Sequence, residues 1–92
     1  MPTYGEVSAL RRQVVAAIGR DYTLRFAKEL NRRMIALETA MALQQGVDWE
    51  NEPRGMLLVV RADTPLDETS AKLFDELCVW LAGQGFTLEK SA

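Results

Sequence analysis

Apolar residues recur at spacings of three and four near the start of the chain, and four of them share one helical face: Val7, Leu10, Val14 and Ile18. This spacing predicts an amphipathic α-helix over residues 5–18. Gly19 follows the last of these positions, and glycine readily adopts the left-handed backbone conformation that ends many helices. We therefore expect a short connection and then a second helix.

Residues 22–45 contain no glycine or proline and are rich in good helix formers. One apolar stripe runs along the segment and consists of Phe26, Leu30, Met34, Leu37 and Met41. The opposite side carries a basic stripe formed by Arg25, Lys28 and Arg32. A smaller apolar line lies at the flank and consists of Leu24, Ile35 and Ala42. The pattern predicts one helix about 35 Å long.

The second half of the chain has a different pattern. Residues 56–62 (MLLVVRA) are apolar without alternation, which is typical of a strand covered on both faces. Thr64 and Pro65 are favoured at the start of a helix, and helical apolar spacing continues over residues 65–82. Residues 86–88 (FTL) then indicate a short second strand.

Together these elements predict an α+β fold in a single domain over residues 1–92, with an antiparallel helix pair followed by a strand–helix–strand unit. One or two strands make a poor sheet, because their edges expose unpaired backbone groups, so we expect dimerisation to complete it. The alternative is that residues 86–88 do not pair. The expected core consists of Val7, Leu10, Val14, Ile18, Phe26, Leu30, Leu37, Leu58, Val60, Leu73, Leu77, Trp80 and Leu81.

The composition is that of an ordinary folded protein, with 48 % hydrophobic and 26 % charged residues, but its charge is unevenly distributed. Residues 1–33 carry seven basic and three acidic side chains, whereas residues 34–92 carry four basic and ten acidic ones. This asymmetry can steer an oppositely charged partner, although solvated helix faces explain the same pattern. The single cysteine fits a reducing compartment, so we expect a cytoplasmic protein without a membrane span.

Residues suited to catalysis are scarce. The sequence contains no histidine, which is the commonest general base and metal ligand. Cys78 lies at the edge of the apolar face of residues 65–82, which favours a structural thiol over a nucleophile. Asp48, Glu50 and Glu52 alternate as in calcium loops, but the glycine and the distal glutamate of such a loop are missing. We predict a protein that is not an enzyme, with no catalytic residue, no metal site and no cofactor.

Binding is the function class that these features favour. We expect a small adaptor or inhibitor-type protein that acts through protein–protein contacts on its polarised surface. The candidate contacts are the basic stripe and an acidic loop around an aromatic residue: Arg25, Lys28, Arg32, Asp48, Trp49, Glu50 and Glu52. The alternative is a nucleic-acid-associated regulator that uses the basic stripe. An isoelectric point near 5.1 and the length of the second helix disfavour it.

A homodimer is the expected assembly. The first helix is too short to cover the whole apolar stripe of residues 22–45, and the helix of residues 65–82 must also pack on the predicted strand. Met34, Leu37 and Met41 are therefore the candidate self-association residues. Flexible methionine side chains are common at such contacts. The alternative is a monomer in which residues 47–55, including Trp49, fold over the exposed end of the second helix.

Overall fold

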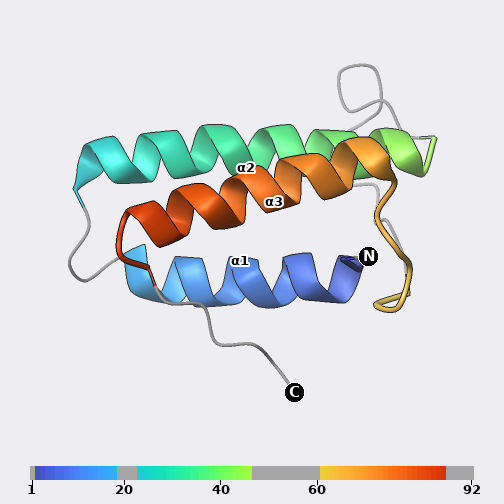
Figure 1. The fold of residues 1–92 in the computed structure, drawn as a ribbon, viewed down its shortest axis with the longest axis horizontal. Helices are drawn as coiled ribbons and strands as arrows, with labels where there is room; N and C mark the ends of the chain where they lie inside the picture. The colour runs from blue at the N-terminus through green and yellow to red at the C-terminus, as the bar shows by residue number, and fades with distance from the viewer. Residues whose placement is uncertain (1, 19–22, 47–60, 87–92) are drawn as a thin grey trace.

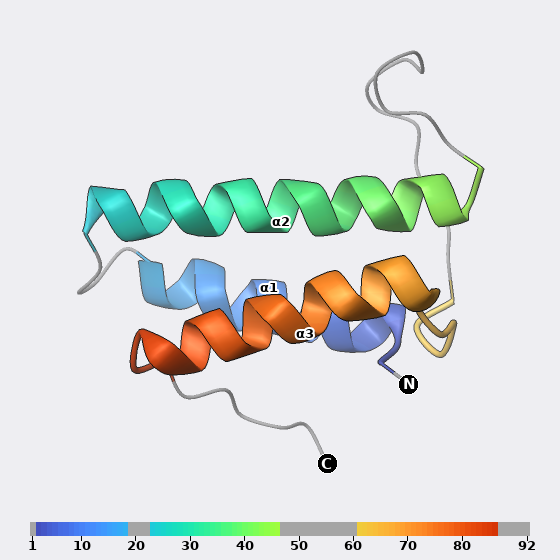
Figure 2. The same ribbon diagram turned by 45° about the horizontal axis from the view of Figure 1, so that its top comes forward.

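The structure, a computed structural model of the chain, describes residues 2–18, 23–46 and 61–86. Of these residues, 78 % are helical and form three helices: α1 (Tyr4–Ile18), α2 (Leu24–Gln44) and α3 (Glu68–Gly83). α1 and α3 run in one direction and α2 runs in the other (Figure 1). α3 lies along one side of the α1–α2 pair, so the three helices form an up–down–up bundle (Figure 1 and Figure 2).

The predicted α+β fold is therefore wrong. No strand occurs within the described ranges, where Arg61, Ala62 and Phe86 belong to no strand. Residues 56–60 and 87–88, which complete the two predicted strands, lie outside the described residues. The strand prediction for residues 56–62 depended on a short apolar run without alternation, and such a run does not by itself define a strand. Phe86 instead packs into the helical core, where it is 9 % exposed.

α3 begins later than the sequence indicates. The helix is capped by Asp67 rather than Thr64, and the Asp67 side chain accepts a hydrogen bond from the Ser70 amide at 2.8 Å. Pro65 forms an antiparallel bridge with Thr3. This bridge keeps the backbone extended ahead of Asp67, so helical geometry cannot start at Pro65 despite its favourable side chain.

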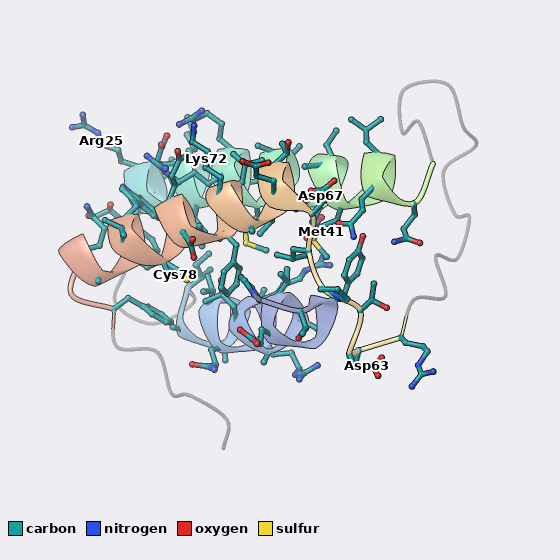
Figure 3. The ribbon with its side chains drawn as sticks, turned by 45° about the vertical axis from the view of Figure 1, so that its right-hand side comes forward. Arg25, Met41, Asp63, Asp67, Lys72 and Cys78 are labelled. Carbon is teal, nitrogen blue, oxygen red and sulfur yellow. The ribbon has the colours of Figure 1, made fainter. Side chains whose placement is uncertain are left out.

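A polar cluster joins the start of α1 to the end of α2. The Tyr4 hydroxyl donates a hydrogen bond to the Met41 carbonyl oxygen at 2.8 Å and accepts one from Gln45 Nε2 at 3.2 Å. The Gln44 side chain accepts a hydrogen bond from the Asp67 amide at 3.0 Å. Met41 and Asp67 both lie at this end of the bundle (Figure 3). These bonds fix how α1 and α3 enter the bundle relative to α2.

The expected core is confirmed for the described residues. Eight of its members are buried, namely Val7, Leu10, Val14, Phe26, Leu30, Leu37, Leu77 and Leu81. Ile18, Leu73 and Trp80 are partly buried and pack against them, whereas Leu58 and Val60 lie outside the described residues. The core also contains buried residues that the sequence analysis did not include: Tyr4, Met34, Leu66, Ala71 and Phe86.

Ser70 supplies a first testable prediction. Its hydroxyl is completely buried, and no hydrogen-bond partner for it exists in the described part of the chain. A buried polar group without a partner loses its hydration and gains nothing in return. We expect Ser70→Ala to raise the free energy of unfolding by about 1 kcal/mol in urea denaturation. Ser8→Ala, at an exposed helical position, reports the gain in helix propensity alone, and a less stable Ser70→Ala protein would contradict this account.

Candidate binding surface

The three predicted basic residues line one open hollow between the start of α2 and the end of α3. The hollow, with a volume of about 880 Å³, is hereafter called the basic hollow. It is lined by Thr23, Leu24, Arg25, Phe26, Lys28, Glu29, Arg32, Trp80 and Gln84. The structure thus brings Arg25, Lys28 and Arg32 together and adds residues from α3 that are distant in sequence. Figure 3 shows Arg25 extending away from the bundle into solvent.

The basic hollow lies at the N-terminal end of α2, and the residue at position 23 determines where that helix begins. Thr23 caps the helix, because its hydroxyl accepts a hydrogen bond from the Phe26 amide at 3.2 Å. The first amides of a helix carry a partial positive charge, which adds to the charges of Arg25 and Lys28. Within the described residues neither of these two side chains forms an ion pair, so both are available to an anionic partner.

Glu29 is the carboxylate that the described residues contribute to the basic hollow, and two arginines donate hydrogen bonds to it. Arg32 donates to it through Nη2 at 2.7 Å and through Nε at 3.0 Å, and Arg33 Nε donates at 2.9 Å. The hydrogen bonds from Arg32 lower the Glu29 pKa from 4.5 to about 2, and the charges of both arginines act in the same direction. The same interaction raises the pKa of Arg32. Among the described residues that line the hollow, three cations stand against one carboxylate, which gives this lining a net positive charge at neutral pH.

The lowered pKa of Glu29 predicts a pH dependence of stability. The Glu29 pKa is depressed in the folded chain, so its contribution is fully present above its ordinary pKa of 4.5. That contribution is lost as the pH falls toward about 2. We measure the free energy of unfolding by urea denaturation at pH 5 and at pH 2.5. Its decrease between these two pH values should be smaller for Glu29→Gln than for the wild-type chain. A carboxyl titration of Glu29 by NMR with a midpoint at or above 4 would contradict the assignment.

Trp80 forms the aromatic wall of the basic hollow and is partly covered by two side chains of α2. Its ring stacks on Phe26 with centroids 5.0 Å apart and an interplanar angle of 16°. The Arg33 guanidinium carbon lies 5.1 Å from the Trp80 ring centroid. Phe26 and Arg33 are seven residues apart on α2, which corresponds to about 10.5 Å along the helix axis. Both side chains thus cover part of the Trp80 ring, which reduces the area open to a stacking ligand.

Cys78 behaves as the sequence analysis expects of a structural thiol. It is partly buried and packs against the core cluster. Burial raises its pKa, and the nearby charges of Asp75 and Glu6 raise it further. A raised pKa lowers the fraction of reactive thiolate at neutral pH. The side chain is therefore poorly suited to nucleophilic chemistry.

The predicted binding surface also has an acidic half. Asp48, Trp49, Glu50 and Glu52 all lie outside the described residues. Their assignment to partner binding stays a prediction from the sequence. The basic hollow also contains residues that the sequence analysis missed, Thr23, Glu29 and Gln84. Thr23 could have been found from the sequence, because threonine is favoured as the cap of a helix that begins at residue 24. No sequence pattern indicates that Gln84 lies near α2.

The residues predicted for self-association lie inside the bundle. Leu37 is completely buried, Met34 is 9 % exposed, and Met41 packs against the core cluster. The sequence argument assumed that the helix of residues 65–82 also packs on a strand, which would leave part of the stripe on α2 bare. No strand occurs in the described ranges, and α3 packs along α2 instead. Self-association stays a prediction, and in this fold it requires other side chains.

Comparisons with protein-family models, curated proteins and solved structures found no match to this chain. No described helix is both long enough and apolar enough to cross a membrane. The described residues also hold no group of three or more metal-ligating side chains. The function of this chain is therefore inferred from the geometry and charge of its surfaces.

Proposed function

We propose that this protein is a small, non-enzymatic binding protein whose basic hollow receives an acidic segment of another protein. The observation that carries the proposal is that Arg25, Lys28 and Arg32 all line one open concave surface. Arg25 and Lys28 form no ion pair within the described residues. A carboxylate of another protein can therefore pair with them without displacing an existing ion pair. The polarised charge of the chain would favour encounter with such a segment.

The shifted pKa values of Glu29, which lines the basic hollow, and of Cys78, which lies outside that lining, support binding rather than catalysis. Glu29 is held ionised by Arg32 and Arg33, so it is a poor proton donor at neutral pH. The raised pKa of Cys78 keeps it protonated. Both shifts move the groups away from the neutral range in which acid–base and nucleophilic catalysis operate. The proposal therefore assigns the charges of the basic hollow to recognition.

The partly covered Trp80 ring favours an acidic polypeptide over a nucleic acid. Proteins that bind single strands stack bases on exposed aromatic side chains, and this stacking supplies much of their affinity. Trp80 is already partly covered by Phe26 and Arg33. An extended acidic segment needs no stacking platform, because its carboxylates can contact the cations at the rim. The basic stripe alone remains the argument for the nucleic-acid alternative.

Fluorescence anisotropy with a labelled peptide of eight glutamates tests the proposal. We expect binding at 20 mM salt that weakens strongly at 200 mM, because salt screens exposed charges. Arg25→Glu should weaken binding about tenfold, since reversing one charge changes the binding free energy by roughly 1 kcal/mol or slightly more. Arg12→Glu is the matched control, because it makes the same charge change at an exposed position on α1, outside the basic hollow.

Three outcomes would overturn the proposal. The first is no binding of the glutamate peptide at low salt with protein at millimolar concentration. The second is equal weakening by Arg25→Glu and Arg12→Glu, which would mean that the attraction depends on overall charge alone. The third is tighter binding of a labelled sixteen-nucleotide poly(dT) than of the peptide at equal ionic strength, which would favour the nucleic-acid alternative.

A further inference from the structure

A second surface lies between α1 and α2 and is apolar rather than basic. This groove, with a volume of about 160 Å³, is called the α1–α2 groove. Its lining consists of Arg11, Val14, Val15, Ile18, Ala27, Leu30, Asn31, Met34, Ile35 and Glu38. Val15 and Ile35 line it from the two helices and are 63 % and 55 % exposed. Large apolar side chains are thus exposed beside an apolar groove.

The arrangement of the bundle explains why this groove is open. α2 packs more closely against α3 than α1 packs against either helix. α3 lies on one side of the α1–α2 pair, and no described helix covers the other side (Figure 1 and Figure 2). A cavity of about 150 Å³ holds a molecule the size of benzene, so the α1–α2 groove has room for one or two aliphatic side chains. It is too small for a whole helix.

The outer face of α2 carries a self-complementary pattern. Its residues are Leu24, Lys28, Asn31, Ile35 and Glu38, at successive spacings of four, three, four and three. This is the heptad spacing by which one helix packs against another. Suppose that two copies of α2 pack antiparallel with a two-fold axis near residue 33. Lys28 of one copy then lies opposite Glu38 of the other copy, and Asn31 lies opposite Ile35. The charges are then opposite across the contact.

We propose that a second copy of this chain occupies the α1–α2 groove, with the two α2 helices antiparallel about a two-fold axis. Ile35 of each copy enters the groove of the other, and Lys28 of each lies opposite Glu38 of the partner subunit. A two-fold axis requires a patch that is complementary to itself, and the placement of Lys28 and Glu38 meets that requirement in charge. The proposal goes beyond the basic hollow and assigns self-association to the exposed side of α2. The two surfaces share Leu24 and Lys28, so Arg25 is the unpaired cation of the hollow that the dimer leaves available.

The ion pairs within one chain are compatible with this contact. Arg11 Nη1 lies 3.4 Å from Glu38 Oε1, and the Glu38 side chain remains 35 % exposed. A carboxylate has several acceptor sites, so Glu38 can keep Arg11 and also accept a hydrogen bond from Lys28 of the partner subunit. Lys28 forms no ion pair of its own within the described residues.

Sedimentation equilibrium of the full chain between about 5 and 200 μM tests the proposal. We expect a reversible species at twice the 10.3 kDa chain mass. Ile35→Lys should raise the dimer dissociation constant at least tenfold, whereas Val79→Lys should leave it unchanged, because Val79 is 73 % exposed but lies on α3. A single species at the chain mass throughout, or equal effects of the two substitutions, would overturn the proposal. Far-ultraviolet circular dichroism confirms that the variants remain folded.

A charge exchange tests the antiparallel register separately. Glu38→Lys should weaken the dimer because it places two lysines opposite each other, and Lys28→Glu should weaken it by pairing two carboxylates. The double variant Lys28→Glu/Glu38→Lys restores opposite charges and should recover at least half of the lost binding free energy. A double variant weaker than both single variants would overturn the proposed register. The glutamate peptide should bind the double variant less well, since Lys28 also lines the basic hollow.

Discussion

Leu37→Ala should destabilise the protein by about 3 to 5 kcal/mol, the largest effect expected of any single substitution considered for this chain. Leu37 is completely buried in the middle of α2, within the cluster to which all three helices contribute. Truncation removes apolar contacts and leaves a cavity that three rigid helices cannot fill. For a domain whose total stability is of the order of 5 to 15 kcal/mol, this loss is a large fraction of the whole.

The same substitution at Leu43 provides a matched control. Leu43 lies on the same helix but is 60 % exposed, so Leu43→Ala should change the free energy of unfolding by less than about 0.5 kcal/mol. Urea denaturation followed by circular dichroism measures both variants. Equal stability of the two variants would mean that Leu37 does not face the core and that the bundle is assembled differently.

Trp80→Ala should cost about 2 to 3 kcal/mol, because Trp80 forms an aromatic contact between α2 and α3 at the end that carries the basic hollow. The indole is only partly buried, so the cost lies below that of a fully enclosed tryptophan. The stack on Phe26 and the Arg33 guanidinium above the ring both add to the packing of the indole.

Val79→Ala is the neighbouring control for this prediction. Val79 is 73 % exposed on α3, so its truncation should have little effect on stability. Phe26→Leu should lose less stability in the Trp80→Ala background than in the wild-type chain, because the aromatic stack is then already absent. Additive losses would contradict the stacked arrangement that partly covers Trp80.

The helices could be predicted from the sequence because their apolar periodicity is long and regular. The predicted ranges 5–18 and 22–45 agree closely with α1 and α2, and the predicted apolar stripe on α2 faces the core. The start of α3 could not be predicted, because Pro65 is held in a bridge with Thr3, far away in the sequence. Local capping preferences carry no information about such a contact.

The fold class was wrong for a related reason. The run of residues 56–62 has strand-like composition but no periodicity, and composition alone does not define the partner that a strand requires. Among the described residues α3 packs along α2, and Leu37 and Met34 are buried within the bundle. The predicted self-association residues followed from the mistaken fold. The exposed flank of α2, which includes Leu24 and Ile35, was visible in the sequence as a second apolar line.

The basic residues of the candidate site could be predicted, but the site could not. Arg25, Lys28 and Arg32 share a helical face, and the spacing of three and four predicts this directly. The hollow also needs Trp80 and Gln84, which α3 brings to the start of α2 by antiparallel packing. Such a juxtaposition is a property of tertiary structure, and no pattern within one helix contains it.

The central claim is that the basic hollow is the surface that binds an acidic partner, and NMR tests it most directly. Amide shifts are recorded on the full chain while the peptide of eight glutamates is added. The account predicts that the largest shifts occur at Thr23, Arg25 and Lys28 at the start of α2, and that they disappear in Arg25→Glu. Largest shifts beside Val15 and Ile35, or no shifts at millimolar peptide, would contradict the claim.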